Sequence, residues 1–410
     1  MPRRPVRRPD DDLPFPRDAF DPLPPPPVVR LGDPGDLAAA LPQLIGFRPQ
    51  ESLVLVGLGG SSGSRVGLTA RTDLPPPAHA AALARALAAR LRCDDPEAAV
   101  LAVVTEEPDV AGPAADDAGA DLPRRDLVHE FVVALQAQGL PLRQALLVRG
   151  GRWWSYDCPL ACCAPGAGTP VPGGTSALAA ASVAAGQVVA GSRDELVARL
   201  APADAAAGRM AEVVVAVGEE LAGLVARAGR DGAADRYAAW VDEAVRGGAG
   251  ARPDDAEVAR VVWGLRDVRV RDRALGYALG ASAAAAEQLW TECTRRAPVP
   301  LDAAPATLLA VSAWLRGDGT TARIALDRAL DAEPDYALAR LLSQGLDAGL
   351  SPADLRAMVA GTQADLDGVP GDRRRGQPVT AARAAPTAAP GRARPGRPAR
   401  PRTRPRRSPG

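Results

Sequence analysis

The chain has 410 residues, which is long enough for two or three domains. Apolar residues make up 47% of it and aromatic residues only 3%, so Ala, Leu and Val must fill most of any core. The net charge is zero, but residues 371–410 carry 12 Arg and one acidic residue, which makes that tail +11 and leaves −11 for the rest. An acidic body of this kind is not expected to bind nucleic acid, and only the tail could attract it.

Both ends of the chain are rich in Pro and Arg. Ten prolines fall within residues 1–30 and eight within residues 371–410. Neither segment has the apolar content that would offset the entropy cost of ordering it. We therefore predict disordered tails over residues 1–30 and 361–410.

The sequence shows few of the signals that are typical of membrane or secreted proteins. The best candidate for a membrane span, residues 177–190, is rich in Ala and interrupted by polar residues, and no apolar segment follows the first arginines. The five cysteines are an odd number, which favours a reducing compartment over a disulfide scaffold. We therefore predict a cytoplasmic protein without a transmembrane helix.

Residues 31–204 alternate between helix and strand patterns, which predicts an α/β domain. The first helix should begin after Asp33 and Pro34 and end before Gly46, because Asp caps helices and Pro favours their first turn. The final helix of the domain has a capping box at Ser192 and Glu195. Between them we predict strands over 52–58, 65–71, 98–106 and 144–150, helices over 78–91 and 124–139, and a strand over 152–157 that pairs back on 144–150.

From residue 205 to residue 360 strand patterns disappear, and the periodicity predicts an all-α domain. Helices are expected over 211–229, 234–248, 254–265 and 273–296, and each of the last three contains a tryptophan that we interpret as its core anchor, namely Trp240, Trp263 and Trp290. Residues 317–336 resemble the second half of a tetratricopeptide repeat. Because only one such unit is visible, we interpret it as the end of the helical domain and not as a peptide-binding array.

A glycine-rich segment, residues 57–63, follows a predicted strand as dinucleotide-binding loops do. Such a loop needs a helix whose N-terminus faces the phosphates, but the next segment has a strand pattern. We therefore predict a hairpin loop. All 49 basic residues are Arg, which excludes a P-loop lysine.

The segment 266–273 alternates charge signs between two predicted helices. The simpler interpretation is a solvated turn with ion pairs. The functional alternative is an anion site formed by Arg269, Arg271 and Arg273. We favour the turn because Arg is the only basic residue that this chain uses.

Residues 153–170 concentrate aromatic residues and thiols, with cysteines at positions 158, 162 and 163. The spacing of Cys158 and Cys162 suits a zinc site, but adjacent side chains usually point apart, so Cys162 and Cys163 are not expected to bind one ion together. Cys93 or His129 could supply a missing ligand. Three interpretations stay open, which are reduced structural thiols, a zinc site, and a redox or nucleophilic group.

Histidines are scarce, since the chain has only His79 and His129. A Ser-His-Asp or Cys-His arrangement therefore has few ways to form. The one pairing that we consider is His129 with Cys158, Cys162 or Cys163, and we favour the alternative of a partly exposed histidine on a helix.

The same region offers a candidate small-molecule site. Arg149, Trp153, Tyr156 and Cys158 combine a guanidinium, aromatic faces and a thiol near the expected C-terminal ends of parallel strands. Clefts at such strand ends commonly bind ligands. An enzyme or binding protein would have its site here.

Four segments together resemble the actinobacterial domain-of-unknown-function 4192 family, namely residues 36–58, 70–75, 151–170 and 317–342. The resemblance covers about residues 31–360. It implies a cytoplasmic protein of two parts and supplies no activity or catalytic residues. The aromatic residues before the cysteines, the cysteine cluster and the Gly-Thr-Pro turn at 168–170 belong to the pattern of that family.

Our first hypothesis is a non-enzymatic cytoplasmic protein that acts through protein–protein contacts, because catalytic arrangements are missing from the sequence. The alternatives are an enzyme or small-molecule-binding protein with its site near residues 153–163, and a fold stabilised by zinc at Cys158, Cys162 and Cys163. Zinc is the one cofactor considered. Nucleic acid is expected to bind only through the tail, membrane binding is not expected, and the oligomeric state is not predicted.

Overall fold

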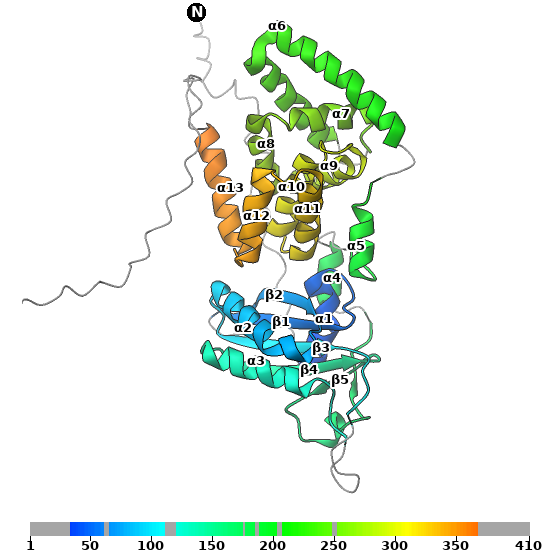
Figure 1. Ribbon diagram of the computed structural model, residues 1–410, viewed down its shortest axis with the longest axis vertical. Coiled ribbons are helices and arrows are strands. Elements are labelled where there is room, and N and C mark those ends of the chain that lie inside the picture. The colour runs from blue at the N-terminus through cyan, green and yellow to red at the C-terminus, as the bar shows by residue number, and fades with distance from the viewer. Residues whose placement is uncertain are drawn as a thin grey trace, which may run out of the picture. The chain divides into compact units, whose positions relative to one another are not determined.

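The computed structural model describes residues 33–60, 65–110, 120–174, 177–184, 188–202, 207–247 and 252–367. These residues belong to one compact unit (Figure 1). We call residues 33–202 the sheet half and residues 207–367 the helical half. The predicted tails lie outside the described residues, except that the last helix extends past residue 360 to Asp367.

The sheet half contains a mixed six-stranded sheet with the strand order β2-β1-β3-β4-β5-β6. Neighbouring strands are antiparallel apart from β3 and β4, which run parallel. The predicted hairpins β1–β2 and β4–β5 are both present, so the element that follows β1 is a strand and not a helix. Residues 57–59 of the glycine-rich segment belong to β1, and residues 61–63 lie outside the described residues. The strands are β1 (Ser52–Gly59), β2 (Arg65–Asp73), β3 (Ala98–Val104), β4 (Leu142–Arg149), β5 (Arg152–Ser155) and β6 (Thr169–Pro170).

Helices cover the two faces of the sheet differently. The helix α1 (Pro34–Ile45) has the predicted Asp33 cap and ends at Gly46, whose left-handed φ of 84° suits glycine. It packs with one set of alternating strand residues, and α2 (Ala80–Leu91) and α3 (Arg125–Ala137) pack side by side with the other set. The inward residues of α2 are mostly alanines and not the leucines that set its predicted apolar face.

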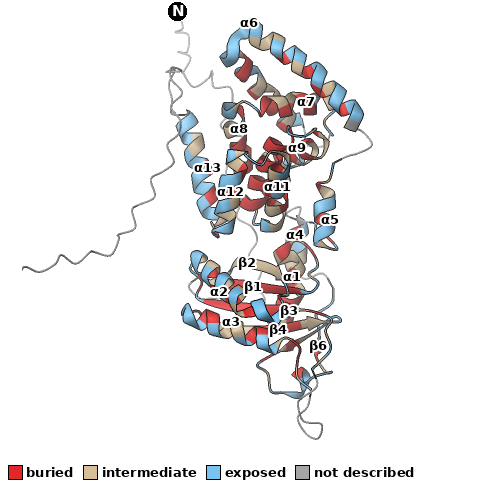
Figure 2. Cartoon of the chain, viewed as in Figure 1, coloured by how far each residue is buried: buried red, intermediate tan, exposed pale blue. Residues whose placement is uncertain are grey.

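The helical half begins after two short helices, α4 (Ala177–Ala184) and α5 (Arg193–Arg199). Buried residues gather in α10 and α11, whereas the surface of α13 is largely exposed (Figure 2). The remaining elements are α6 (Ala207–Gly247), α7 (Asp255–Gly264), α8 (Val268–Ala274), α9 (Ala283–Arg296), α10 (Ala303–Leu315), α11 (Gly319–Ala332), α12 (Ala337–Asp347) and α13 (Pro352–Asp367), with short 3-10 turns η3 (Pro77–His79), η4 (Arg92–Asp94), η5 (Ala161–Cys163) and η7 (Leu275–Leu279).

Two predictions for the helical half are wrong. Residues 273–296 do not form one helix, because the chain leaves helical geometry at Gly280, between η7 and α9. Residues 266–273 are not a turn, since most of them form α8, which Asp267 caps through the Arg269 N–H. The local cap therefore outweighs the charged pattern that suggested a loop.

The tryptophan anchors differ in burial. Trp290 is almost completely buried, whereas Trp240 and Trp263 are partly exposed. The Trp240 ring is stacked on Tyr237 and flanked by the guanidiniums of Arg236 and Arg260, at 5.2 and 5.8 Å from the ring centre. All three tryptophans contact the same hydrophobic cluster, as predicted for core anchors, but only Trp290 is fully buried within it.

The two halves share one hydrophobic cluster, which runs from one face of the sheet through α1 and α5 into α9–α12. Hydrogen bonds join the halves as well, since the Thr320 hydroxyl donates to the Ile45 carbonyl at 2.8 Å and Arg328 donates to the Leu200 carbonyl at 3.4 Å. The change from strands to helices near residue 204 is therefore a change of architecture within one compact unit. None of the described helices has the length and apolarity needed to cross a bilayer.

Candidate functional site

The cysteine cluster lies in a loop between β5 and β6, residues 156–168, which we call the thiol loop. The chain leaves β5 at Tyr156, makes the η5 turn at Ala161–Cys163 and returns through Gly166 and Gly168, both with left-handed φ. Glycine is the residue that adopts this conformation without a steric cost. The loop is therefore a tight, defined structure.

The thiol loop brings three sulfur atoms together. The Sγ atoms of Cys158, Cys162 and Cys163 all lie within 4.8 Å of one another, and those of Cys162 and Cys163 are 4.0 Å apart. In a tetrahedral zinc site with Zn–S bonds of about 2.3 Å, neighbouring sulfurs lie about 3.8 Å apart. The expectation that Cys162 and Cys163 would point apart is wrong, because the 3-10 turn holds them on one side.

The three thiols have different environments. Cys163 is buried, and burial raises the pKa of its thiol to about 11, although the Ser155 N–H donates to its sulfur at 3.3 Å. The backbone N–H of Leu160 lowers the pKa of Cys158, which is half-buried. Cys162 is exposed. The cluster therefore combines one sheltered sulfur with one that solvent reaches freely.

Trp154 of β5 forms the floor under the thiol loop. Its indole Nε1 donates to the Ala164 carbonyl at 3.2 Å, and a Cβ added at Gly168 would come within 2.4 Å of the ring. Arg152 donates to the carbonyls of Ala167 and Gly168 at 2.9 and 2.7 Å. The sheet therefore fixes the position of the loop that carries the thiols.

Arg149, at the end of β4, also supports the loop. Its guanidinium lies 4.9 Å from the Trp154 ring centre, pairs with Asp109 at 2.8 Å and donates to the Glu107 carbonyl at 2.6 Å. The other carboxylate oxygen of Asp109 accepts the Gly166 N–H at 2.8 Å. Arg149 is therefore engaged within the protein and braces the thiol loop through Asp109.

A family model described as "Domain of unknown function (DUF4192)" matches residues 34–353. The chain belongs to the DUF4192 family. The match begins at the first residue of α1 and ends within α13, so the whole thiol loop lies inside the DUF4192 region. No curated protein and no solved structure matches the chain. Since the DUF4192 description assigns no activity, function has to be argued from the site itself.

The structure separates the residues of the predicted small-molecule site. Trp153 and Trp154 lie on opposite faces of the sheet, and Trp153 packs with the cluster that the helical half shares. Tyr156 is buried, and its hydroxyl donates to the Pro123 carbonyl at 2.7 Å. Of the four predicted residues, Cys158 lies in the thiol cluster and Arg149 supports it. We expected a ligand site where several parallel strands end. Among the described strands, only β3 and β4 run parallel.

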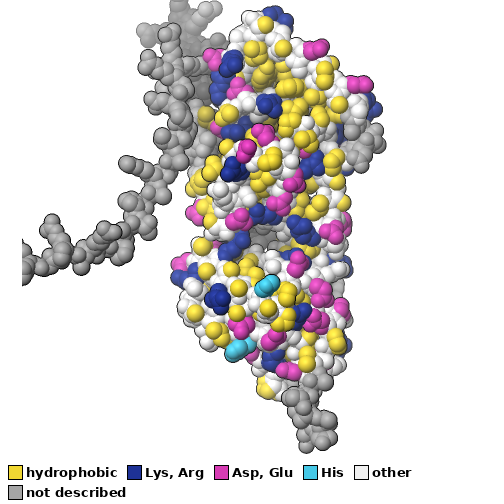
Figure 3. Space-filling model, in the orientation of Figure 1, with side chains coloured by type: hydrophobic (Ala, Val, Ile, Leu, Met, Phe, Trp, Pro, Cys, Tyr) yellow, Lys and Arg dark blue, Asp and Glu magenta, His cyan; other side chains and the backbone are white. Residues whose placement is uncertain are grey.

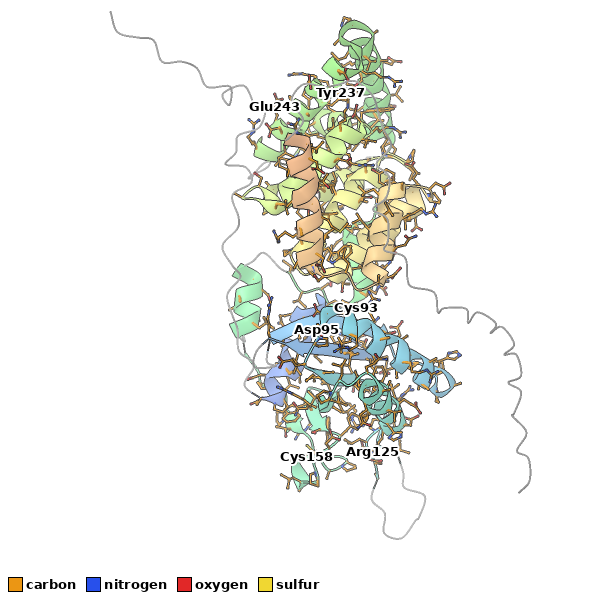
Figure 4. All side chains as sticks on the ribbon, turned by 90° about the vertical axis from the view of Figure 1, so that its left-hand side faces the viewer. Cys93, Asp95, Arg125, Cys158, Tyr237 and Glu243 are labelled. Atoms are coloured by element: carbon orange, nitrogen blue, oxygen red, sulfur yellow. The ribbon has the colours of Figure 1, made fainter. Side chains whose placement is uncertain are left out.

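The proposed extra ligands lie elsewhere. Cys93 is at the end of the sheet half near Gly349 of the helical half, well away from Cys158 (Figure 4). His129 is an exposed residue of α3, and Figure 3 shows the two histidines as separate surface patches. In the part of the chain that the structure describes, the group of potential ligands contains only the three cysteines.

The predicted anion site is made of engaged arginines. Arg269 pairs with Asp267 and Asp231, and Arg271 pairs with Asp272 and lies over the Tyr336 ring. Arg273 belongs to the same helix, α8. These contacts favour the structural interpretation, although it now concerns a helix and not a turn.

A second group of charged side chains, which was not predicted from the sequence, lies between α9 and the α10–α11 turn. Glu287 of α9 and Arg316 and Asp318 at the α10–α11 turn line a cavity of about 230 Å³. Each residue by itself is an ordinary charged residue of a helix or turn. Only the packing of α9 against α10 brings them together, so no local pattern could have revealed them.

Proposed function

We propose that the protein binds a thiophilic metal ion, with Zn²⁺ as the first candidate, through Cys158, Cys162 and Cys163. The observation that carries the proposal is the convergence of the three sulfurs within 4.8 Å. Thiolates are preferred ligands of Zn²⁺ and of other soft metal ions. The backbone N–H groups of Ser155 and Leu160, which donate to two of the sulfurs, are suited to stabilise thiolates.

Three protein ligands leave one position of a tetrahedral ion open. Closed structural zinc sites use four protein ligands, whereas sites with three keep a position for water or another ligand. The exposed Cys162 places this position near solvent. The ion would tie Cys158, near the start of the thiol loop, to the η5 turn and present a coordination position at the surface.

The test is metal analysis of the full chain, purified in reduced form without a metal-affinity tag and reconstituted with Zn²⁺. We expect about one equivalent in the wild type and less than about a tenth in Cys158→Ser and Cys162→Ser. The exposed Cys93, which lies outside the loop, provides the matched control Cys93→Ser. Reconstituted wild type with less than a tenth of an equivalent and fully reactive thiols would exclude the proposal.

We further propose that the protein works in the cytoplasm. All five cysteines are free thiols, and a thiolate metal site requires reduced cysteines. Fractionation of the source cells with an antibody to the chain tests this location. Recovery of the protein with the membrane or secreted fraction would contradict it.

A second candidate function is protein–protein contact without enzymatic activity, centred on the thiol loop. Leu160 is 64% exposed and precedes the exposed Cys162 by two residues in the thiol loop, so one loop would offer a partner both an apolar side chain and an open coordination position. We expect Leu160→Ser to lose a stoichiometric partner that the wild type retains. The control Val133→Ser alters a residue of α3 that is 49% exposed. Equal retention by both variants would remove this candidate. Nucleic-acid binding through residues 371–410 stays a prediction, since that tail lies outside the described residues.

A further inference from the structure

Solvent reaches the three sulfurs of the thiol loop to different degrees. Cys162 is exposed and lies among exposed neighbours, Ala161 and Ala164, so a small solute meets its side chain without obstruction. Cys158 is half-buried, and Cys163 is only 6% exposed. Because exposure is one of the properties that make a cysteine prone to oxidation, Cys162 is the sulfur of the loop that a dissolved oxidant contacts first.

The exposed sulfur has a second sulfur within reach. The Sγ atoms of Cys158 and Cys162 lie within 4.8 Å of each other. A disulfide has an S–S bond of about 2.05 Å, so these two atoms need to approach each other by at most about 3 Å. The contacts of Trp154 and Arg152 with the loop backbone hold both cysteines on the same edge of the sheet.

Cys163 is a poor disulfide partner for Cys162. The Cα atoms of adjacent residues are about 3.8 Å apart, whereas ordinary disulfides join Cα atoms about 4.4–6.8 Å apart. The Cys163 sulfur is also buried and accepts the Ser155 N–H at 3.3 Å. Cys158 is therefore the partner that suits Cys162, and Cys163 stays a thiol.

Cys93 provides a comparison within the chain. It is exposed as Cys162 is, but it lies at the other end of the sheet half from Cys158 (Figure 4). The remaining cysteine, Cys293, is fully buried in α9. Exposure is thus combined with an accessible second thiol in the thiol loop and not at Cys93.

We propose that the thiol loop is a reversible oxidation site for hydroperoxides, in which Cys162 reacts first and Cys158 closes a disulfide with it. The Cys162 sulfur attacks one peroxide oxygen. An S–O bond forms, the O–O bond breaks, and the leaving oxygen takes the thiol proton and departs as alcohol or water. The Cys158 sulfur then attacks the Cys162 sulfur, the S–O bond breaks, and the hydroxyl leaves with the Cys158 proton as water. Two thiols lose two electrons in all, and one peroxide gains them.

The disulfide would remove two of the three ligands of the proposed metal site, so a bound Zn²⁺ would be released. This consequence rests on the proposed function, whereas the oxidation itself needs no metal. Exposed disulfides are the ones that thiols reduce most easily, so a thiol reductant should restore the site.

The experiment treats the full chain, reduced and freed of metal, with one equivalent of hydrogen peroxide at neutral pH. The remaining thiols are alkylated, and trypsin then cleaves after Arg, which leaves the three loop cysteines in the peptide 153–193 and Cys93 in the peptide 93–124. We expect peptide 153–193 to lose two hydrogens and to take up one alkyl group, on Cys163. Peptide 93–124 should stay fully alkylated.

Variants separate the two steps. Cys158→Ser should stop at a sulfenic acid on Cys162, which dimedone traps, and Cys162→Ser should leave Cys158 and Cys163 as thiols at the same peroxide dose. The control Cys93→Ser changes another exposed thiol and should form the loop disulfide like the wild type. Circular dichroism of each variant before oxidation identifies any loss of fold.

The proposal is overturned if all three loop cysteines of the wild type are alkylated after peroxide treatment, if the disulfide joins Cys162 to Cys163, or if Cys93 is oxidised as fast as the loop. A second sample, reconstituted with Zn²⁺, should release the ion to a chelating dye on peroxide addition. Zinc retained after disulfide formation would overturn the release. If the chain binds no zinc, the proposed function fails, and the metal-free sample still decides the oxidation.

Discussion

The two faces of the sheet are completed in different ways. The face with Leu53, Leu55 and Leu101 is closed by α2 and α3, which lie close to those strands in the sequence. The face with Val54 and Val56 packs with α1, and its cluster continues through α5 into the helical half. One face is therefore covered by local elements, and the other depends on residues more than a hundred positions later in the chain.

This difference explains why the sheet half and the helical half form one unit. A sheet whose two faces were fully covered by its own helices would fold as a separate domain, joined to the next by a linker. Here the helix α1 belongs to the same core as α10, and residues of both halves bury one another. Stability should consequently be shared between halves of unlike architecture.

The largest loss of stability should come from truncating a large side chain in either hydrophobic core. Trp290→Ala in the shared cluster and Phe131→Ala in the cluster under α2 and α3 should each lower the free energy of unfolding by about 3–5 kcal/mol, because both side chains are buried. Urea unfolding followed by circular dichroism at strand and helix wavelengths measures this. Trp290→Ala should shift both signals together. A shift of the helix signal alone would show that the halves unfold independently.

The ion pair of Arg328 with Asp302 tests whether contacts between the two halves contribute to stability. Asp302 is fully buried, and Arg328 pairs with it at 2.8 Å and also donates to the Leu200 carbonyl of the sheet half. Arg328→Met should cost about 3 kcal/mol, because it leaves a buried carboxylate without its partner. The control Arg340→Met removes an exposed pair with Asp335 and should cost at most about 1 kcal/mol. Equal losses in thermal unfolding would contradict the role assigned to Arg328.

The thiol loop provides a smaller test on the other face. Gly168→Ala should cost about 2 kcal/mol, because the residue has a φ of 71° and the new methyl would collide with Trp154. Gly173→Ala is the control, since a Cβ there meets nothing within 4 Å. The thermal midpoint and the zinc content of both variants measure the effect. Gly168→Ala with unchanged stability and metal content would mean that Trp154 does not hold the loop.

The smallest expected effect concerns the stability of the protein at acidic pH. Hydrogen bonding from Arg296, aided by Arg209, lowers the pKa of Asp255 below its usual value. A carboxyl with a lowered pKa in the folded state contributes stability above its unfolded pKa of about 4, and this contribution is lost as the pH falls further. The thermal midpoint of Asp255→Asn should therefore change less than that of the wild type between pH 7 and pH 3. Parallel pH profiles would be evidence against this linkage.

Much of the fold was predictable because its signals are local. Asp33, Pro34 and Gly46 delimit α1, and alternation or short apolar runs identify the strands. The helix predicted over 273–296 failed because helical periodicity carries no information on where a glycine such as Gly280 interrupts it.

The candidate site was predictable only in part. Three close cysteines mark the thiol loop in the sequence, but the meeting of Cys162 and Cys163 depends on the η5 backbone. The charged cavity was not predictable, since Glu287 and Arg316 meet only through the packing of separate helices. Pairings of this kind are set by the tertiary structure and have no local pattern.

The shared cluster has a consequence for synthesis on the ribosome. The strands and α1 emerge first, but the residues that complete their second face belong to α9–α12 and are made much later. During that interval the nascent chain exposes apolar surface of the shared cluster, including Ile45 beside Thr320, that the finished protein buries. Such surfaces are typical binding sites for chaperones and for aggregation between neighbouring chains. Truncated translation products that end before α9 should therefore be poorly soluble, although they contain every strand of the sheet.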